Sequence, residues 1–564
     1  MTDIRRTILW VIFGFSLVML WDQWQVYNGK PATFFPSAKQ TATAPKGPAT
    51  ATPPTAGASA VPGAAVATAP SAVPGTTAPA ASAAPRERIT VKTDLMDVVF
   101  DTEGATIVQT DFPKLAGDKP GIPFVLLEQG PERVYVAQSG LIGGDFPTHK
   151  TVMTATPGER VMKDGQNELA IRFESPVQGG VKLAKTYTFH RGQYDIDVKH
   201  EVINAGSAPV SPQLYLQLVR DGNKLPGQSS FYSTFTGPAV YTHEEKFHKV
   251  EFSDIEKGKA EVPKAANDGY IAMVQHYFAS AWILADGVKR DYFVRKVDNN
   301  LYSAGAIATV PPVPPGMQQV VNARFFAGPQ EEKMLEHVYP GLDLVKDYGW
   351  LTILAKPLYW LLSKLHSFIG NWGFAIMALV LLIKIAFYWL QAKGYESMAK
   401  MKAINPKVMQ LRERYKDNPQ QMQQEMMRIY REEKVNPIGG CLPIFIQIPV
   451  FIALYWVLLS SVEMRGAPWI GWIHDLAQPD PYFILPVVMT LSTMLQTALN
   501  PVPPDPMQAK MMWFMPLIFS VMFFFFPAGL VLYWITNNVL SIAQQWLINT
   551  RMGVPPEFNL PKFK

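Results

Sequence analysis

The chain has 564 residues, with 51 Lys and Arg against 46 Asp and Glu and a formal net charge of +5. This length predicts two to four structural units, and so small a net charge gives no reason to expect a nucleic-acid partner. The single cysteine, Cys441, excludes an intramolecular disulfide and a cysteine-based metal site. We expect no metal site and no cofactor.

Residues 1–30 are predicted to form a transmembrane anchor. Arg5 and Arg6 precede a short apolar run, and two Trp and one Tyr follow it as an interfacial aromatic belt. Because Lys and Arg next to a span stay on the cytoplasmic side, the N-terminus is predicted to be cytoplasmic. The alternative is a cleaved signal peptide, but no small-x-small cleavage site closely follows the apolar run.

Two soluble segments follow this anchor. Residues 31–88 are almost wholly Ala, Pro, Thr, Ser, Gly and Val, which predicts a disordered linker. Residues 89–340 consist of short alternating runs broken by Gly, Pro, Asn and Asp. Residues 185–190 and 194–200, joined by a Gly-containing turn, predict one hairpin. We therefore expect a large all-β sandwich over 89–340, on the outer side of the membrane.

Residues 341–369 are predicted to form an amphipathic helix in the membrane interface. Pro357 is expected to kink this helix. Its apolar residues at helical spacing are Trp350, Leu354, Leu358, Leu361 and Leu365.

Five further spans are expected, which makes the chain a polytopic α-helical membrane protein with six spans. The second span is predicted at 370–392 and spans three to six at 438–551, before a short cytoplasmic tail at 552–564. The apolar cores of the last four spans contain no Asp, Glu, Lys, Arg or His. They cover residues 442–459, 482–499, 511–526 and 529–548.

Residues 393–437 are predicted to be a cytoplasmic helical hairpin. Asn405-Pro406 and Asn418-Pro419 each resemble a capping residue followed by proline at the first helical position. The segment 391–437 has ten Lys and Arg against six acidic residues, so it is placed in the cytoplasm. With the β-domain outside, both chain termini are then cytoplasmic. The basic residues expected to act in the hairpin are Lys407, Arg412, Arg414, Lys416, Arg428 and Arg431.

Lys384 is the one charged residue deep inside any of the five predicted spans from 370 onward. An ammonium group at membrane depth costs roughly 2.5–3.5 kcal/mol on insertion scales, so it indicates a function. No acidic residue in these spans can pair with it, and a substrate could supply the partner. The alternative is a side chain that extends to the lipid headgroups.

Uncharged polar residues on other spans are predicted to line a hydrated groove around Lys384. Hydrogen bonding between helices is the alternative for each of them. They are Gln447, Thr490, Ser492, Gln496, Asn537, Asn538 and Ser541.

The span over 511–526 is only about 16 residues, or roughly 24 Å of helix. Large, soft side chains on this and neighbouring spans predict an apolar slide for a substrate helix, with a lipid-facing surface as the alternative. The predicted slide comprises Ile444, Ile448, Phe451, Met515, Phe519, Phe523 and Trp534.

No enzyme motif is present: the chain has no P-loop, no Gly-x-Ser-x-Gly and no His-Glu-x-x-His. Several motifs in the C-terminal part resemble those of the YidC family of membrane protein insertases. They are Asn-Trp-Gly-Phe at 371–374, Ser-Met-Ala-Lys-Met at 397–401, Glu-Met-Met at 425–427, Val-Asn-Pro-Ile-Gly-Gly-Cys-Leu-Pro at 435–443, Trp-Ile-His-Asp-Leu at 472–476 and Phe-Pro-Ala-Gly-Leu-Val-Leu-Tyr at 526–533.

The resemblance implies a nucleotide-independent insertase and chaperone of the inner membrane, which works alone or beside the Sec translocon. Its implied partners are nascent membrane proteins, the Sec translocon and the lipid bilayer, and it allows contacts with the ribosome and the signal-recognition-particle receptor. The family usually has arginine where this chain has Lys384, and often tyrosine where it has Trp534. The short tail argues against a ribosome contact through the tail.

Two other classes of function compete with the insertase. A secondary transporter could use Lys384 to bind a small anion, but no internal repeat of spans and no intramembrane carboxylate supports it. A membrane-anchored carbohydrate-binding or mutarotase-like enzyme could reside in the β-domain. Deleting residues 89–335 would abolish the function of such an enzyme.

Overall fold

The structure is a computed structural model. The predicted anchor and nearly all of the linker lie outside the residues that it describes, and so does most of the tail. The chain divides into two compact units, with the boundary between Lys346 and Asp347. The described residues are 86–117, 121–225, 234–415, 418–433, 442–500, 506–553 and 558.

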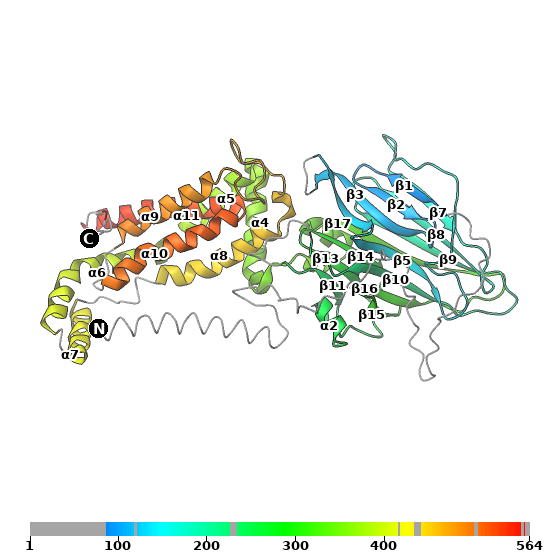
Figure 1. Cartoon of the computed structure of the whole chain (residues 1–564), viewed down its shortest axis with the longest axis horizontal. Coiled ribbons are helices and arrows are strands. Elements are labelled where there is room, and N and C mark those ends of the chain that lie inside the picture. Colours follow the sequence, from blue (N-terminus) through cyan, green and yellow to red (C-terminus); the bar gives the residue numbers. More distant parts are fainter. Residues whose placement is uncertain are drawn as a thin grey trace, which may run out of the picture. The chain divides into compact units, whose positions relative to one another are not determined.

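Two antiparallel sheets form the first unit, as the alternating sequence predicts (Figure 1). The first sheet contains, in spatial order, β1 (Arg88–Lys92), β2 (Asp97–Asp101), β3 (Thr106–Ala116), β4 (Pro123–Gln129), β5 (Val134–Ile142), β10 (Gln213–Asp221), β16 (Leu301–Thr309) and β15 (Arg290–Asp298). The second contains β12 (Lys246–Lys249), β11 (Gly237–Thr242), β13 (Tyr270–Gln275), β14 (Phe278–Leu284), β17 (Gln318–Pro329), β9 (Asp195–Asn204), β8 (Val181–His190), β7 (Glu168–Glu174) and β6 (Thr154–Ala155).

The predicted hairpin at 185–200 is confirmed as β8 and β9, which pair from Val181 opposite Asn204 to Phe189 opposite Ile196. Gly192 lies in the turn with φ +74°, a conformation that a side chain would strain. Aromatic rings fill the space between the sheets: Phe100 of the first sheet packs on Phe173, Tyr187 and Phe189 of the second.

Short helices complete this unit. They are α2 (Phe252–Glu256), α3 (Glu332–Val338) and the 3₁₀ helix η1 (Leu342–Val345). Leu335 of α3 and Leu342 of η1 are buried in one apolar cluster with residues of β11, β13 and β14. The second sheet therefore buries apolar side chains on both of its faces.

The second unit is helical (Figure 1). Its described elements are η2 (Gly349–Leu351), α4 (Thr352–Ile369), α5 (Trp372–Ala386), α6 (Tyr388–Arg414), α7 (Pro419–Glu432), α8 (Leu442–Ser460), η3 (Val462–Met464), α9 (Ile484–Leu499), α10 (Pro506–Met522), η4 (Phe523–Phe525) and α11 (Ala528–Arg551).

The helix predicted over 370–392 is two helices in the structure. α5 ends at Ala386 and α6 begins at Tyr388, and the two are bent by 69°. Phe387 makes the break with φ −97° and ψ 11°, without a proline or glycine. The pattern of apolar residues therefore could not reveal this break, because it runs on across the bend.

Length and hydropathy decide whether a described helix could span a membrane. No single one is both long and apolar enough, whereas α5 and α6 to Leu411 meet the criterion together as a bent pair. The shorter apolar helices are Gln447–Ser460, Ile484–Leu499 and Ala509–Phe525. The number of six spans stays a prediction.

Two local predictions about helix ends have different outcomes. Asn418 caps α7 as predicted, because its Oδ1 accepts a hydrogen bond from the Gln421 amide at 3.3 Å. The cap predicted at Asn405 is wrong, since α6 runs through Asn405 and Pro406 without ending. Proline inside a helix removes one backbone hydrogen bond. The 27-residue helix α6 nevertheless continues past Pro406.

α4 is one helix that includes Pro357. It buries Ala355, Tyr359 and Leu362, while Leu354 of the predicted apolar stripe stays exposed. Leu358, Leu361 and Leu365 of the stripe are half-buried. The location of α4 in the membrane interface stays a prediction.

Candidate functional site

Local sequence fixes the start of α5, the helix that carries Lys384. Gly370 ends α4 with φ +74°, and Asn371 then caps α5 by accepting a hydrogen bond from the Phe374 amide at 3.1 Å. A Cβ on Gly373 would lie 2.2 Å from the Trp469 ring, so only glycine fits there. From Trp372 to Lys384 the helix rises about 18 Å.

Lys384 lies in the last turn of α5 and is only 7% exposed. Its Nζ donates a hydrogen bond to Oγ of Ser541 on α11 at 2.7 Å. Among the described residues, no carboxylate lies within ion-pair distance of this ammonium group. The lysine is therefore held between two helices by a hydroxyl group rather than by a charge.

The described hydrogen bonds of the other predicted groove residues do not reach Lys384, and their place in a groove stays a prediction. Asn538 donates to Ser492 at 3.0 Å and to Thr493 at 2.8 Å, which links α11 to α9. Thr490 donates to the Pro486 carbonyl of its own helix. Asn537 is buried, and Gln447 and Gln496 are half-buried. Of the seven, only Ser541 has a described hydrogen bond to the lysine.

The sequence analysis missed polar residues beside this pair. Tyr395 on α6 interacts with the Ser541 side chain, and Gln391 lies one turn before Tyr395. Gln544 and Gln545 follow Ser541 on α11, and all four side chains are buried. The sequence analysis assigns residues 393–437 to the cytoplasmic hairpin, so Tyr395 was not considered as a neighbour of Lys384. Gln544 and Gln545 lie three and four residues after Ser541, a spacing that puts them on its side of the helix. This spacing could have identified them from the sequence.

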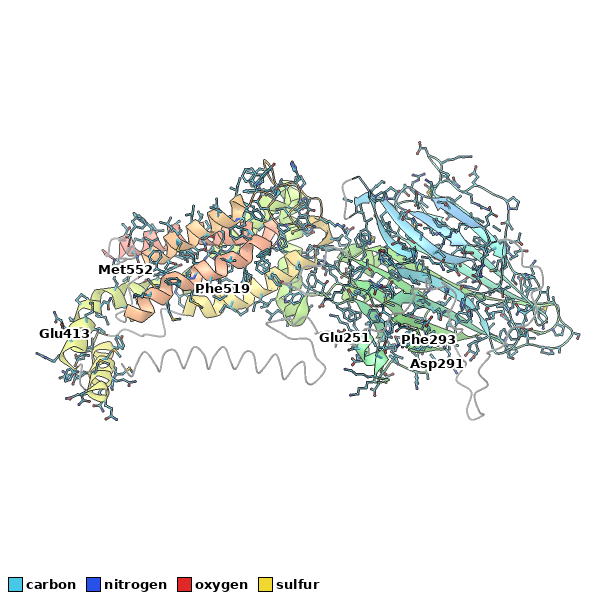
Figure 2. The ribbon with its side chains drawn as sticks, viewed as in Figure 1. Glu251, Asp291, Phe293, Glu413, Phe519 and Met552 are labelled. Carbon is cyan, nitrogen blue, oxygen red and sulfur yellow. The ribbon has the colours of Figure 1, made fainter. Side chains whose placement is uncertain are left out.

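The predicted slide residues fall into two groups. Phe451, Phe523 and Trp534 pack together, with ring centroids 4.8 Å apart for Phe451–Trp534 and 5.1 Å for Phe523–Trp534. Exposed side chains form the second group: Ile448 on α8 and Met515 on α10. Phe519 on α10 is also exposed (Figure 2). The side chain of Ile444 lies outside the described residues.

The basic residues of the predicted hairpin make local, exposed ion pairs. Lys407 pairs with Glu433, and Arg428 pairs with Glu425 and Glu432. Arg431 donates to the Met427 carbonyl at 3.4 Å, and Arg414 is exposed. Such exposed pairs contribute about 0–1 kcal/mol each. The side chains of Arg412 and Lys416 lie outside the described residues.

The β-unit contains a fully buried lysine on β8, which the sequence analysis also missed. Lys185 on β8 is fully buried, and its Nζ donates to the carbonyls of Gly104 and Ser139 at 2.6 and 2.7 Å. Burial lowers the pKa of Lys185 to about 7. Burial and the nearby Lys185 charge lower the pKa of His200, whose Nε2 lies 3.0 Å from Ser139 Oγ, to about 3.

The β-unit also contains a cavity of about 500 Å³. None of the predicted site residues lines it. Its lining comprises His190, Gly192, Gln193, Tyr194, Asp195, Asp197, Arg324, Met334, His337 and Val338.

A large β-sandwich followed by apolar helices around one buried cation is the pattern of a membrane protein with a globular domain outside the bilayer. Comparison with known families agrees with this class. Residues 88–361 match the family described as the YidC periplasmic domain, and residues 364–554 match the 60Kd inner membrane protein.

Full-length relatives identify the family. A protein of Cupriavidus taiwanensis is 57% identical over 552 residues, which cover 98% of each chain, and one of Burkholderia lata is 57% identical over 553 residues, 98% of this chain and 99% of that one. Both are named membrane protein insertase YidC. The chain belongs to the YidC family: it is a multi-pass inner-membrane insertase with a periplasmic domain, and not an enzyme.

Solved structures resemble the chain more weakly. An active YidC insertase with its first transmembrane domain resolved is 19% identical, covers 81% of this chain and 91% of its own, and gives a TM-score of 0.38. A galactose mutarotase related enzyme from Lactobacillus acidophilus covers 43% of this chain and 97% of its own, at 11% identity and a TM-score of 0.30. Scores this low support no argument about function. Family membership sets aside the transporter and the mutarotase-like enzyme.

Proposed function

We propose that this insertase uses Lys384 as the charge that attracts an acidic or polar segment of a nascent membrane protein into a hydrated groove. The observation that supports this role is a buried ammonium group whose described partner is one neutral hydroxyl. A carboxylate of the substrate would be the stronger partner. At an intermediate dielectric, one such ion pair supplies a few kcal/mol, enough to bias the path without trapping the substrate.

The route of the substrate helix follows from the exposed apolar side chains. Ile448 of α8 and Met515 and Phe519 of α10 offer a soft apolar surface beside the bundle. A substrate helix would pass along them into lipid, driven by the burial of its own apolar surface. The hairpin of α6 and α7 receives the nascent chain first.

The orientation in the membrane and the partners are part of the same proposal. The excess of Lys and Arg at 391–437 supports a cytoplasmic hairpin, with both termini on the same side of the membrane. The protein then works alone or beside the Sec translocon. Contacts with the ribosome and the signal-recognition-particle receptor would pass through the basic hairpin rather than the tail.

The test of this function uses the purified full-length protein in liposomes. A single-span protein with an acidic N-terminal tail is translated in their presence, and its insertion is scored by protease protection. Wild type and Lys384→Arg should protect the substrate, whereas Lys384→Ala should lose most of the protection. Lys364→Ala, which removes an exposed lysine of α4, is the matched control and should behave as wild type.

Equal protection by Lys384→Ala and wild type would remove the lysine from the mechanism while leaving the insertase intact. A second substrate with a neutral tail separates charge recognition from general damage. It should lose much less protection than the acidic-tailed substrate in Lys384→Ala.

A further inference from the structure

Lys384 and Ser541 come from different helices, and their hydrogen bond of 2.7 Å is buried on both sides. We propose that Ser541, supported by Tyr395, is a positioning residue that holds the Lys384 ammonium group in place for the substrate. This inference rests on the proposed role of Lys384. It adds a specific residue that makes the lysine effective.

A lysine side chain is long and flexible, so its ammonium group needs an acceptor to stay in one place. Without an acceptor, a buried ammonium group on a flexible four-carbon stem extends toward the headgroups or loses its proton. Ser541 lies on α11, not on the lysine's own helix, and it is 1% exposed. Its hydroxyl thus fixes Nζ against α11, deep in the bundle.

The bond to Ser541 leaves N–H donors of Lys384 available for the substrate. A lysine ammonium group has three donors. The described bond to Ser541 occupies one of them, so two remain to bind a carboxylate or a backbone carbonyl of the substrate. A neutral hydroxyl orients the group without neutralising it, which an acidic residue in the same place would do.

Tyr395 supports Ser541 from a third helix. It lies on α6, beyond the break at Phe387, is 8% exposed, and its side chain interacts with that of Ser541. Lys384, Ser541 and Tyr395 therefore join α5, α11 and α6 through one chain of polar groups. A hydroxyl held from both sides has fewer orientations, so its lone pair is kept toward the ammonium group.

Neighbouring amides indicate that the polar region continues beyond these three residues. Gln391 Oε1 and both amide atoms of Gln544 are buried and have no hydrogen-bond partner among the described residues. Gln391 shares a helix face with Tyr395, and Gln544 shares one with Ser541. Buried amides are normally hydrogen-bonded, so these groups are suited to the polar part of a substrate or to water.

The test measures insertion by full-length variants in liposomes, with the acidic-tailed and the neutral-tailed substrate. Ser541→Ala should lower the initial rate of insertion of the acidic-tailed substrate about tenfold and that of the neutral-tailed substrate less than twofold. Ser541→Thr keeps a hydroxyl and should restore most of the rate. Thr536→Ala is the matched control, because Thr536 is a buried hydroxyl on α11 that donates to its own helix at Leu532.

A double variant separates positioning from packing. If Ser541 acts through Lys384, Ser541→Ala combined with Lys384→Ala should be no slower than Lys384→Ala alone. Equal losses for both substrates, or additive losses in the double variant, would overturn the proposal, because they indicate damage to the bundle.

The two proposals fail in different ways. A normal rate with Ser541→Ala and a reduced rate with Lys384→Ala would reject the positioning role and leave the function of the lysine standing. Normal rates with both variants would reject the role of the lysine itself.

Discussion

Lys185 in the sandwich and Lys384 in the helical unit are both buried, and they are held differently. Lys185 in the sandwich donates to two backbone carbonyls, those of Gly104 and Ser139. Lys384 in the helical unit donates to a single hydroxyl on a neighbouring helix. The two backbone carbonyls belong to the main chain of the sandwich, whereas the Ser541 hydroxyl takes up only one of the three N–H donors of Lys384. The first lysine is therefore locked into the fold, and the second keeps donors that can bind a further partner.

Charge reversal should have the largest effect and tests the second half of this comparison. Lys384→Glu should reduce insertion of an acidic-tailed substrate by roughly 30-fold or more, because it replaces attraction with repulsion at a buried site. Replacing the acidic residues of the tail with lysines should restore part of the insertion. Protease protection in liposomes measures both, and equal insertion of the two tails would contradict a charge-based role.

The dependence of the sandwich's stability on pH tests the part of the comparison that concerns Lys185. The pKa of Lys185 is about 7 in the folded state and about 10.4 in an unfolded chain. Between these values the unfolded state binds more protons, so the free energy of unfolding should rise with pH, by at most about 1.4 kcal/mol per pH unit. Below pH 7 both states are protonated and this contribution to the slope disappears.

Hydrogen exchange of the full-length protein, read at β8 and β9, measures this slope. Lys185→Met removes the titrating group and should flatten the rise between pH 7 and 10. The same variant should insert the acidic-tailed substrate within about twofold of wild type. An unchanged slope in Lys185→Met would show that another group titrates in this range.

His200 should give an effect in a lower pH window. Its pKa is lowered from 6.5 to about 3, chiefly by burial and further by the charge on Lys185. As pH falls from 6.5 toward 3, the unfolded state takes up a proton that the folded state excludes, so the sandwich should lose stability. His200→Gln should reduce this loss, and His337→Gln, at an exposed position, should not. Hydrogen-exchange rates of the β9 amides between pH 6.5 and about 3 measure this loss of stability in both variants.

Deleting residues 89–335 should have the smallest effect on insertion. The lysine, Ser541 and the exposed apolar side chains all lie in the helical unit, so the truncated protein should insert the acidic-tailed substrate within about threefold of the full chain. Protease protection in liposomes with equal protein amounts tests this. Loss of all insertion would assign the periplasmic unit an essential part.

Structural features that are set by residues close together in the sequence were predictable. The β8–β9 hairpin and the Asn418 cap follow from alternation, a glycine turn and one capping side chain. The break at Phe387 was not predictable in this way, since apolar residues continue on both sides of it. The Asn405-Pro406 pair resembles a helix start locally, but the fold carries α6 through it.

Partners of buried charges were the hardest to predict. Lys384 was recognisable because it is the one charge in an apolar stretch, but Ser541 was one of seven polar candidates and Tyr395 was not among them. Lys185 alternates with apolar residues in β8, as an outward-facing lysine also would. Which face of a strand or helix is buried depends on segments far away in the chain, and one sequence does not contain that information.

The bend at Phe387 has a mechanical consequence. α6 has 27 residues and is about 40 Å long, so a rotation of about 10° at the bend moves its far end by about 7 Å. Lys384 lies on the other side of this pivot, on a helix capped by Asn371. Tyr395 lies eight residues after Phe387, so the same rotation moves it by only about 2 Å. Its contact with Ser541 is therefore the part of α6 that such a rotation disturbs least.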